Sequence, residues 1–181
     1  MSLLTKYDHV FLCSGGVDSA YLTLTRRPRY ESGLALFVNY QQPAAKKERA
    51  AAKMMAKSGK CDFAEVVVSG LPLGDMIEGS IGPCVVPARN LWLISLAAAF
   101  GTQIWIGCAP QDERDYEDCR LEFLSAGDLH LQTLGKRLNW SQDSRQTRID
   151  KLTELNLIDY VWSCYGPGNP GPCGECASCK Q

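Results

Sequence analysis

Residues 8–27 read Asp-His-Val-Phe-Leu-Cys-Ser-Gly-Gly-Val-Asp-Ser-Ala-Tyr-Leu-Thr-Leu-Thr-Arg-Arg, and this stretch decides the fold. Its first part, residues 8–13, is a short and mostly apolar run that predicts a buried strand. Two adjacent glycines end the run, and residues 18–27 then predict a helix that stops before Pro28. A strand, a glycine turn and a helix in this order begin a βαβ unit.

The same alternation continues along the chain. Further strands are predicted at residues 34–38, 64–68 and 104–108, and helices at residues 44–57, 90–100, 120–138 and 148–155. Residues 71–86 are rich in Gly and Pro and predict a loop. We therefore expect an α/β fold with a Rossmann-like parallel sheet and helices on both faces. Ligands of such sheets bind beyond the carboxyl ends of the strands, where the strand order reverses.

The loop that joins the first strand to the first helix reads Ser14-Gly15-Gly16-Val17-Asp18-Ser19. Glycines let the backbone approach a ligand closely, and the helix start adds unpaired N–H groups and a positive dipole end. No Lys follows as a Walker loop requires, and the spacing also differs from Gly-x-Gly-x-x-Gly. The loop thus predicts a pyrophosphate site of another kind, with Asp18 as a candidate Mg²⁺ ligand. The alternative is an ordinary turn in which Asp18 and Ser19 only cap the helix.

Four of the nine cysteines lie in the last eighteen residues, at Cys164, Cys173, Cys176 and Cys179. Their Cys-x8-Cys-x2-Cys-x2-Cys spacing suits a closed tetrahedral Zn²⁺ site with a structural role. An iron–sulfur cluster is the first alternative, and unligated or disulfide-paired thiols are the second. We expect residues 1–160 to form the nucleotide-binding α/β domain and residues 161–181 to form a zinc-binding tail.

Composition excludes several classes of protein. The chain has 181 residues, of which 45% are hydrophobic, and its net charge is −1. This balance suits a globular domain and gives no electrostatic footprint for nucleic acid or an anionic membrane surface. Residues 91–100 form the longest apolar stretch, which is too short to span a bilayer. Since the N-terminal residues show no signal sequence, we expect a cytoplasmic protein that binds neither nucleic acid nor membrane.

Four further segments, taken with the loop, resemble a known family in order along the chain. They are Phe-Val-Asn-Tyr-Gln-Gln at 37–42, Val-Pro-Ala-Arg-Asn at 86–90, Tyr-Glu-Asp-Cys-Arg-Leu-Glu-Phe at 116–123, and Trp-Ser-Cys-Tyr at 162–165 with the terminal cysteines. The loop is similar to that of the PP-loop ATP pyrophosphatases, and the whole set resembles their 7-cyano-7-deazaguanine (preQ0) synthase branch.

That resemblance implies an ATP-dependent ligase with Mg²⁺ and structural Zn²⁺, which belongs to queuosine biosynthesis. Its substrates would be 7-carboxy-7-deazaguanine and ammonia, joined through an adenylated acid and an amide to give the nitrile. The loop would hold the phosphates of ATP, and a homodimer is one arrangement that the resemblance implies.

The resemblance also assigns site residues. Catalytic candidates are Asp18, Ser19, Arg89, Asp118 and Arg120. Nucleotide-binding candidates are Ser14, Gly15, Gly16, Val17, Asp18 and Ser19, and substrate-binding candidates are Asn90, Asp112, Tyr116 and Cys119. An arginine suits this chemistry because it stays cationic and binds phosphate or carboxylate with two hydrogen bonds. The alternative for Asp118 and Arg120 is that they only cap and pair at a helix start.

Two other functions stay open because the sequence departs from the family in places, as at Pro43 and Ala44, where relatives carry Arg-His. A diverged enzyme would stop at 7-amido-7-deazaguanine or adenylylate another substrate. A second alternative is a nucleotide-binding protein without turnover.

Overall fold

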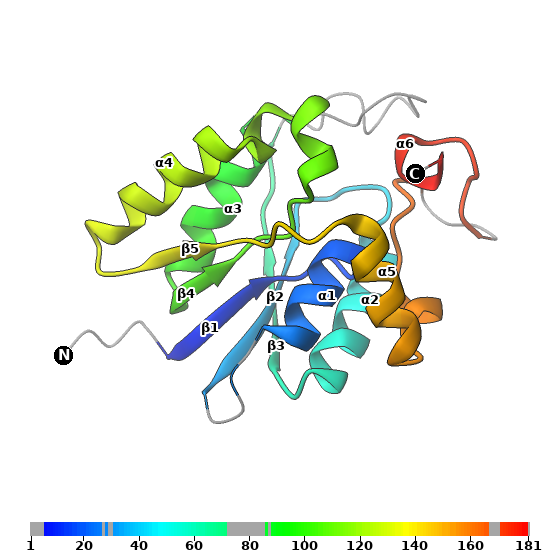
Figure 1. Ribbon diagram of the computed structural model, residues 1–181, viewed down its shortest axis with the longest axis horizontal. Coiled ribbons are helices and arrows are strands. Elements are labelled where there is room, and N and C mark those ends of the chain that lie inside the picture. The colour runs from blue at the N-terminus through cyan, green and yellow to red at the C-terminus, as the bar shows by residue number, and fades with distance from the viewer. Residues whose placement is uncertain are drawn as a thin grey trace.

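A computed structural model describes residues 6–26, 28, 31–71, 86, 88–166 and 171–180. Within these residues one parallel sheet has the strand order β3-β2-β1-β4-β5 (Figure 1). The strands are β1 (Tyr7–Leu12), β2 (Gly33–Asn39), β3 (Asp62–Val67), β4 (Gly101–Trp105) and β5 (Arg137–Asn139). The expected parallel α/β fold is confirmed.

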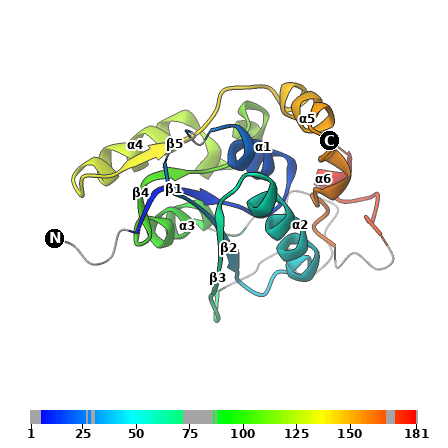
Figure 2. The same ribbon diagram turned by 90° about the horizontal axis from the view of Figure 1, so that it is seen from below.

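Helices cover both faces of the sheet (Figures 1 and 2). On one face lie α1 (Val17–Thr25), α2 (Ala45–Ser58) and α5 (Arg145–Glu154), and on the other lie α3 (Arg89–Ala98) and α4 (Leu121–Gln132). A short helix, α6 (Ala177–Lys180), belongs to the C-terminal tail. Three 3₁₀ turns complete the described part: Pro110–Arg114, Glu117–Cys119 and Ile158–Tyr160.

Alternating side chains of β1 explain the two hydrophobic layers. Val10 and Leu12 pack into the core beneath α3 and α4, whereas Phe11 and Cys13 pack toward the helices on the opposite face. Because both faces of the central strands are covered, these strands read as continuous apolar runs in the sequence. Residues 10–13, at the end of β1 and just after it, are all buried. Residues 34–38 of β2 are buried as well.

The prediction of one helix over residues 120–138 is wrong, because the chain ends this helix early and adds a strand. Helix α4 ends at Gln132, Gly135 adopts a left-handed φ of 68°, and β5 then pairs with β4. Asp128 stabilises this turn, since its carboxylate accepts hydrogen bonds from the Leu138 amide and the Arg137 guanidinium. Tertiary pairing with β4 therefore overrides the helical pattern of the local sequence.

Smaller shifts occur elsewhere. Strand β4 begins and ends about three residues before the predicted 104–108. Helix α5 begins at Arg145 and not at Arg148, because the Ser144 hydroxyl caps it by accepting the Thr147 amide. Between Leu71 and Val86 the predicted loop lies outside the described residues.

The strand order places a topological switch between β1 and β4. The chain runs from β1 outward to β2 and β3, and then returns to the other side of β1 as β4. The connection after β1 and the connection after β4 therefore lead to opposite sides of the sheet. They leave a crevice between them at the carboxyl ends of these two strands. Among the described helices, none has both the length and the apolar character needed to cross a bilayer.

Candidate functional site

A cavity of about 370 Å³ opens at this switch point. Its floor is formed by the carboxyl ends of three strands, through Leu12 of β1, Phe37 of β2 and Ile106 after β4. The cavity therefore lies where a parallel sheet is expected to bind its ligand. Ten of the sequence-predicted site residues line it: Ser14, Gly16, Val17, Asp18, Ser19, Arg89, Asn90, Asp112, Tyr116 and Cys119.

The glycine loop forms one wall of the cavity. Gly16 is the N-cap of α1, and the Ser19 hydroxyl bonds the Gly16 carbonyl at 3.1 Å and lies 3.2 Å from the Ser14 hydroxyl. The first amides of a helix have no acceptor inside the helix, and they carry its positive dipole end. The wall is therefore suited to an anionic group such as a phosphate.

Gly15 sets the shape of the loop from behind the cavity. Its φ is +81°, and a β-carbon there would lie 2.5 Å from the Ala51 Cβ and 2.7 Å from the Ala52 amide nitrogen. Both neighbours belong to α2, so the loop backbone packs directly on this helix. Any side chain at this position would push the loop away from α2.

We predict that Gly15→Ala destabilises the fold by about 2–4 kcal/mol, since it adds a left-handed strain of ~1 kcal/mol to an overpacking cost of ~1–3 kcal/mol. Urea unfolding would measure the loss. Gly135→Ala is the matched control, because Gly135 also has a positive φ of 68° but has no atom within 4 Å of the added carbon. Equal losses in the two variants would refute the packing role of Gly15.

Two arginines of α5, Arg145 and Arg148, organise the acids of the cavity. Arg148 is fully buried and donates to Asp18 at 2.7 Å, while Arg145 donates to Asp18 at 3.0 Å and to Asp112 at 3.2 Å. Arg148 also donates to the carbonyls of Cys108 and Ser141. The Asp18 carboxylate is thus held by two guanidinium groups.

Asp112 lies in the same network and is largely removed from water. Burial raises its pKa above the ordinary value, and the neighbouring Asp18 adds to that rise, whereas Arg145 and Arg148 oppose it. Its other carboxylate oxygen accepts the Ala109 amide at 2.9 Å. The four charged side chains therefore form one coupled unit at the cavity wall.

Arg145 and Arg148 are not among the site residues predicted from the sequence. A signal was present, since both stand in the first turn and a half of a helix, where cations oppose the dipole. Such a placement requires acidic partners from elsewhere. Those partners, Asp18 and Asp112, are separated from the arginines by more than thirty positions in the sequence, so only the tertiary fold reveals them.

On the opposite wall, Arg89 and Asn90 begin α3. Ala88 before them has a left-handed φ of 53°, which costs an alanine about 1 kcal/mol and turns the chain into the helix. Burial works against the charged form of Arg89, but Tyr40, Tyr165 and Asp118 together raise its pKa above the ordinary value. Arg89 is therefore a permanent cation at the cavity wall.

Asp118 and Cys119 hold Asn90 in place. The Asp118 carboxylate accepts the Asn90 amide at 2.9 Å, and the Asp118 carbonyl accepts the Asn90 side-chain amide, also at 2.9 Å. The same side-chain amide lies 3.5 Å from the Cys119 sulfur. Asp118 thus caps the start of α3, and among the described residues it does not line the cavity.

Arg120 is not among the described residues that line the cavity. It is the N-cap residue of α4, it is half exposed, and its guanidinium reaches the Glu113 carbonyl at 3.4 Å and Glu117 at 4.0 Å. These contacts match local pairing at a helix start. Its catalytic assignment, like that of Asp118, stays a prediction.

Two further cavity residues come from outside the predicted set. The first is Tyr165, which is largely buried, with its hydroxyl 3.3 Å from that of Tyr116. Burial raises the pKa of Tyr165, and the nearby Tyr116 hydroxyl raises it further.

The second is Glu48 of α2, which is 9% exposed and accepts a 2.7 Å hydrogen bond from the Gln42 side chain. Burial raises the pKa of Glu48 to about 7, against the opposing effects of Gln42 and Arg89.

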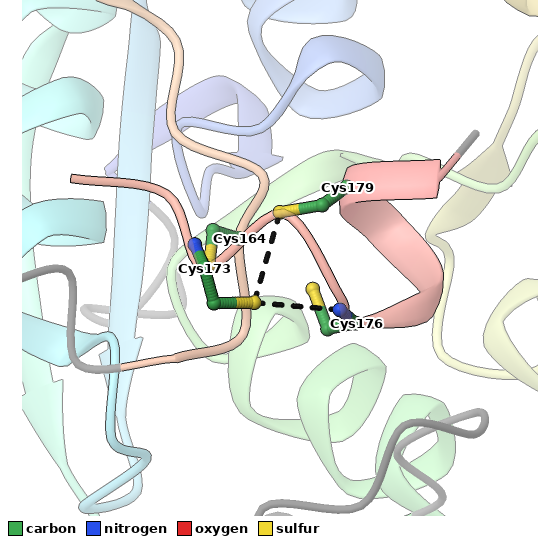
Figure 3. Close-up of side chains that lie close together, drawn as sticks. All are labelled: Cys164, Cys173, Cys176 and Cys179. Atoms are coloured by element: carbon green, nitrogen blue, oxygen red, sulfur yellow. Dashed lines mark hydrogen bonds between the residues drawn. The ribbon is translucent and has the colours of Figure 1, made fainter.

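The four C-terminal cysteines converge on one point (Figure 3). All four sulfurs lie within 4.8 Å of one another, and those of Cys173 and Cys179 are 3.9 Å apart. A tetrahedral site with metal–sulfur bonds of about 2.3 Å needs sulfur separations of about 3.8 Å, so small side-chain adjustments close the cluster on an ion. The cluster can therefore hold a metal ion.

Backbone amides surround two of these sulfurs. The amides of Gly166 and Cys173 each lie 3.3 Å from the Cys164 sulfur, and the Cys176 amide lies 3.3 Å from the Cys173 sulfur. Backbone amides, led by that of Glu175, lower the pKa of Cys173 to about 6. A lowered pKa favours the thiolate, which is the form that binds a metal.

The tail also reaches the glycine loop. The Trp162 amide donates to the Gly15 carbonyl at 2.9 Å, and a β-carbon on Gly16 would lie 3.6 Å from the Ser163 hydroxyl. Cavity-lining residues from this part of the chain are Trp162, Ser163, Tyr165 and Ser178. The cysteine cluster is thus next to the cavity, and the segment that carries it forms part of the cavity wall.

Comparison with known proteins gives one consistent result. Residues 69–181 match the family described as "Queuosine biosynthesis protein QueC". The chain is 31% identical to the 7-cyano-7-deazaguanine synthase of Methanospirillum hungatei JF-1, over 94% of this chain and 90% of that protein. It is 30% identical to the synthase of the same name from Persephonella marina, over 95% and 88%, and 29% identical to that of Synechococcus sp. strain CC9902, over 94% and 88%.

Proposed function

Since the chain belongs to the QueC family of queuosine biosynthesis proteins, we propose that it converts 7-carboxy-7-deazaguanine and ammonia into 7-cyano-7-deazaguanine at the expense of ATP. The observation that carries the proposal is the shared cavity. The glycine loop at the start of α1 and the cationic Arg89 face one space of about 370 Å³ at the switch point. A nucleotide polyphosphate and an anionic acid therefore have places next to each other.

The chemistry explains why both anions must meet. A carboxylate is a poor electrophile, and transfer of AMP to its oxygen creates a leaving group. Ammonia then displaces AMP to give the amide, and a second activation of the amide oxygen followed by elimination gives the nitrile. Positioning and charge neutralisation carry most of the rate enhancement in such reactions.

The loop residues 14–19 would bind the phosphates through backbone amides and the two serine hydroxyls. Arg89 would neutralise the carboxylate or the α-phosphate, and the cavity residues Asn90, Tyr116 and Cys119 would contact the deazaguanine. A cavity lined by the loop, helix α3 and the tail would also limit the access of water to a reactive adenylate.

Where Mg²⁺ is bound, Asp18 and Asp112 would hold it. Both carboxylates bond the same guanidinium nitrogen of Arg145, so their oxygens lie close together. Carboxylate oxygens are the ligands that Mg²⁺ prefers, and the ion supplies positive charge for the phosphates.

The C-terminal cluster would hold Zn²⁺. Four sulfurs within 4.8 Å of one another leave no position for a substrate, so the role would be structural. In this proposal residues 1–160 form the catalytic domain. Residues 161–181 form a tail that is held together by the metal ion and contributes to the cavity wall. The division into domains, the homodimer and the cytoplasmic location stay predictions.

Product analysis tests the proposed reaction. The purified protein would be incubated with 7-carboxy-7-deazaguanine, ATP, Mg²⁺ and ammonium, and the products would be identified by mass spectrometry. We expect the nitrile together with AMP and pyrophosphate. Accumulation of the amide alone would favour the diverged enzyme, and nucleotide binding without AMP or pyrophosphate would refute turnover.

A further inference from the structure

The proposed reaction needs a proton acceptor that none of the assigned residues provides. Ammonia is mostly ammonium at neutral pH, and ammonium has no lone pair with which to attack an activated acid. A general base must reach the nitrogen, and its pKa works best near the operating pH. The inference that follows rests on the proposed function.

Glu48 is an acid in the wall of the proposed reaction cavity. It lines the cavity with the glycine loop and Arg89, although it belongs to α2 and is only 9% exposed. Its position is three and four residues before Ala51 and Ala52, against which Gly15 packs. Residues with this spacing share a helix face, so Glu48 lies one turn from the back of the loop.

One oxygen of the Glu48 carboxylate is held by a hydrogen bond from a neighbouring side chain. Its Oε2 atom accepts the Gln42 side-chain amide at 2.7 Å, and that amide also lies 3.3 Å from the Val38 carbonyl. The Gln42 side-chain oxygen in turn accepts the Tyr40 amide at 2.9 Å. This chain of bonds fixes the orientation of Glu48 through neutral amide groups.

The other acids that line the described cavity are already engaged. Asp18 bonds Arg145 and Arg148, and Asp112 bonds Arg145 and the Ala109 amide. Both are therefore suited to phosphate or metal chemistry more than to taking a proton. Asp18 and Asp112 thus form ion pairs with arginines, whereas Glu48 bonds the neutral side-chain amide of Gln42.

Neither histidine can serve instead. The ring of His9 accepts the Trp105 indole N–H at its Nδ1 atom and faces Glu31 with its Nε2 atom, at the opposite end of β1 from the cavity. His130 is exposed on α4. The usual general base of an enzyme is thus absent from the cavity lining.

We propose that the Glu48 carboxylate binds ammonium inside the cavity and removes one proton, so that ammonia is released next to the activated acid. A buried carboxylate attracts a small cation, because the low local dielectric strengthens the interaction between the two charges. Glu48 is then a catalytic residue of the amide-forming step.

The step balances without another reactant. The electron pair of one ammonium N–H bond stays on nitrogen while the proton moves to Glu48. The nitrogen forms a bond to the acyl carbon, and the bond between that carbon and the AMP oxygen breaks with its electrons leaving on AMP. A second proton leaves the new C–N nitrogen to the departing phosphate or to solvent.

The ionisation of Glu48 supports this role. Burial raises its pKa to about 7, while Gln42 from the loop after β2 and Arg89 from α3 oppose the rise. The group is therefore part anion and part acid near neutral pH. It can accept a proton from ammonium and return that proton to solvent in each cycle.

Glu48→Gln tests the assignment, because it keeps the size of the side chain and removes the base. At pH 7 we expect kcat/KM for ammonium to fall about 10²–10⁴-fold, while the KM for the acid stays within about twofold. Activity should recover as the pH rises toward the pKa of ammonium, where free ammonia is supplied by the solution. Steady-state rates at several pH values and ammonium concentrations would measure this.

Glu122→Gln is the matched control. Glu122 also stands in the first turn of a helix, α4, but its side chain is exposed and lies outside the cavity lining. The control should keep wild-type kinetics at every pH. A Glu48→Gln variant with the same ammonium dependence and pH profile as this control would overturn the proposal.

Two further readouts separate this inference from its premise. Pyrophosphate release in a single turnover without ammonium should match the wild type in Glu48→Gln, which also shows that the variant is folded. A raised KM for the acid with normal ammonium dependence would instead assign Glu48 to recognition of the deazaguanine and overturn the proposal. Failure of the wild type to form any product would refute the proposed function itself.

Discussion

Asp18→Asn should lower the rate of pyrophosphate release about 10²–10³-fold, as expected when one preorganised charge is removed from a phosphate-transfer site. The change preserves the shape of the side chain but leaves Arg148 without an anionic partner. Arg148 has no exposed surface, and it keeps hydrogen bonds to the carbonyls of Asp143, Cys108 and Ser141. We therefore also expect a loss of stability of about 3 kcal/mol, at the low end for breaking a buried ion pair.

Asp128→Asn is the control for this experiment. Asp128 also bonds an arginine, Arg137, and a backbone amide, that of Leu138, but it lies at the turn between α4 and β5. It should keep normal activity while losing some stability. Pyrophosphate assays and urea unfolding would be run on both variants, and normal turnover in Asp18→Asn would contradict the assignment of the loop.

Cys176→Ser should abolish stoichiometric zinc binding. Structural zinc contributes on the order of 10–16 kcal/mol to small metal-folded units, and a tail this short has no core of its own. The Cys176 side chain is buried, and the four sulfurs lie within 4.8 Å of one another, so a serine oxygen replaces a soft ligand in a closed site. Metal analysis of the purified protein would measure the zinc content per chain.

Loss of the metal should also weaken the affinity for the nucleotide at least about tenfold. A tenfold change in affinity corresponds to about 1.4 kcal/mol, which is roughly the contribution of one hydrogen bond. The reason is that the Trp162 amide bonds the Gly15 carbonyl and that Ser163 and Ser178 line the cavity. Calorimetry with ATP would measure the affinity. Removal of the metal with a chelator from the wild-type protein should have the same effect.

Cys61→Ser is the matched control for the metal. Cys61 lies outside the cluster, and its sulfur lies 3.6 Å from the Gly59 carbonyl. This variant should keep one zinc per chain and normal ATP affinity. The role of the tail would be refuted if Cys176→Ser lost its zinc and yet bound ATP as tightly as this control.

The sequence by itself determined the fold class and the two local motifs. Buried parallel strands need apolar runs, a phosphate-binding turn needs glycines, and a metal site needs thiols at short spacing, so each leaves a pattern in neighbouring residues. Strands β1, β2 and β3 and helices α1 and α2 follow such local patterns. The loop of residues 14–19 and the four terminal cysteines are visible in the same way.

Only the tertiary structure decided what surrounds these motifs. Strand β5 exists because β4 offers it a partner, and residues 137–139 carry no strand pattern of their own. Arg145 and Arg148 reach Asp18 across more than 120 positions of sequence, and Glu48 reaches the cavity because Gly15 packs on α2. Contacts between distant residues depend on how layers stack, and stacking is set by the packing of the whole chain and not by any one segment of it.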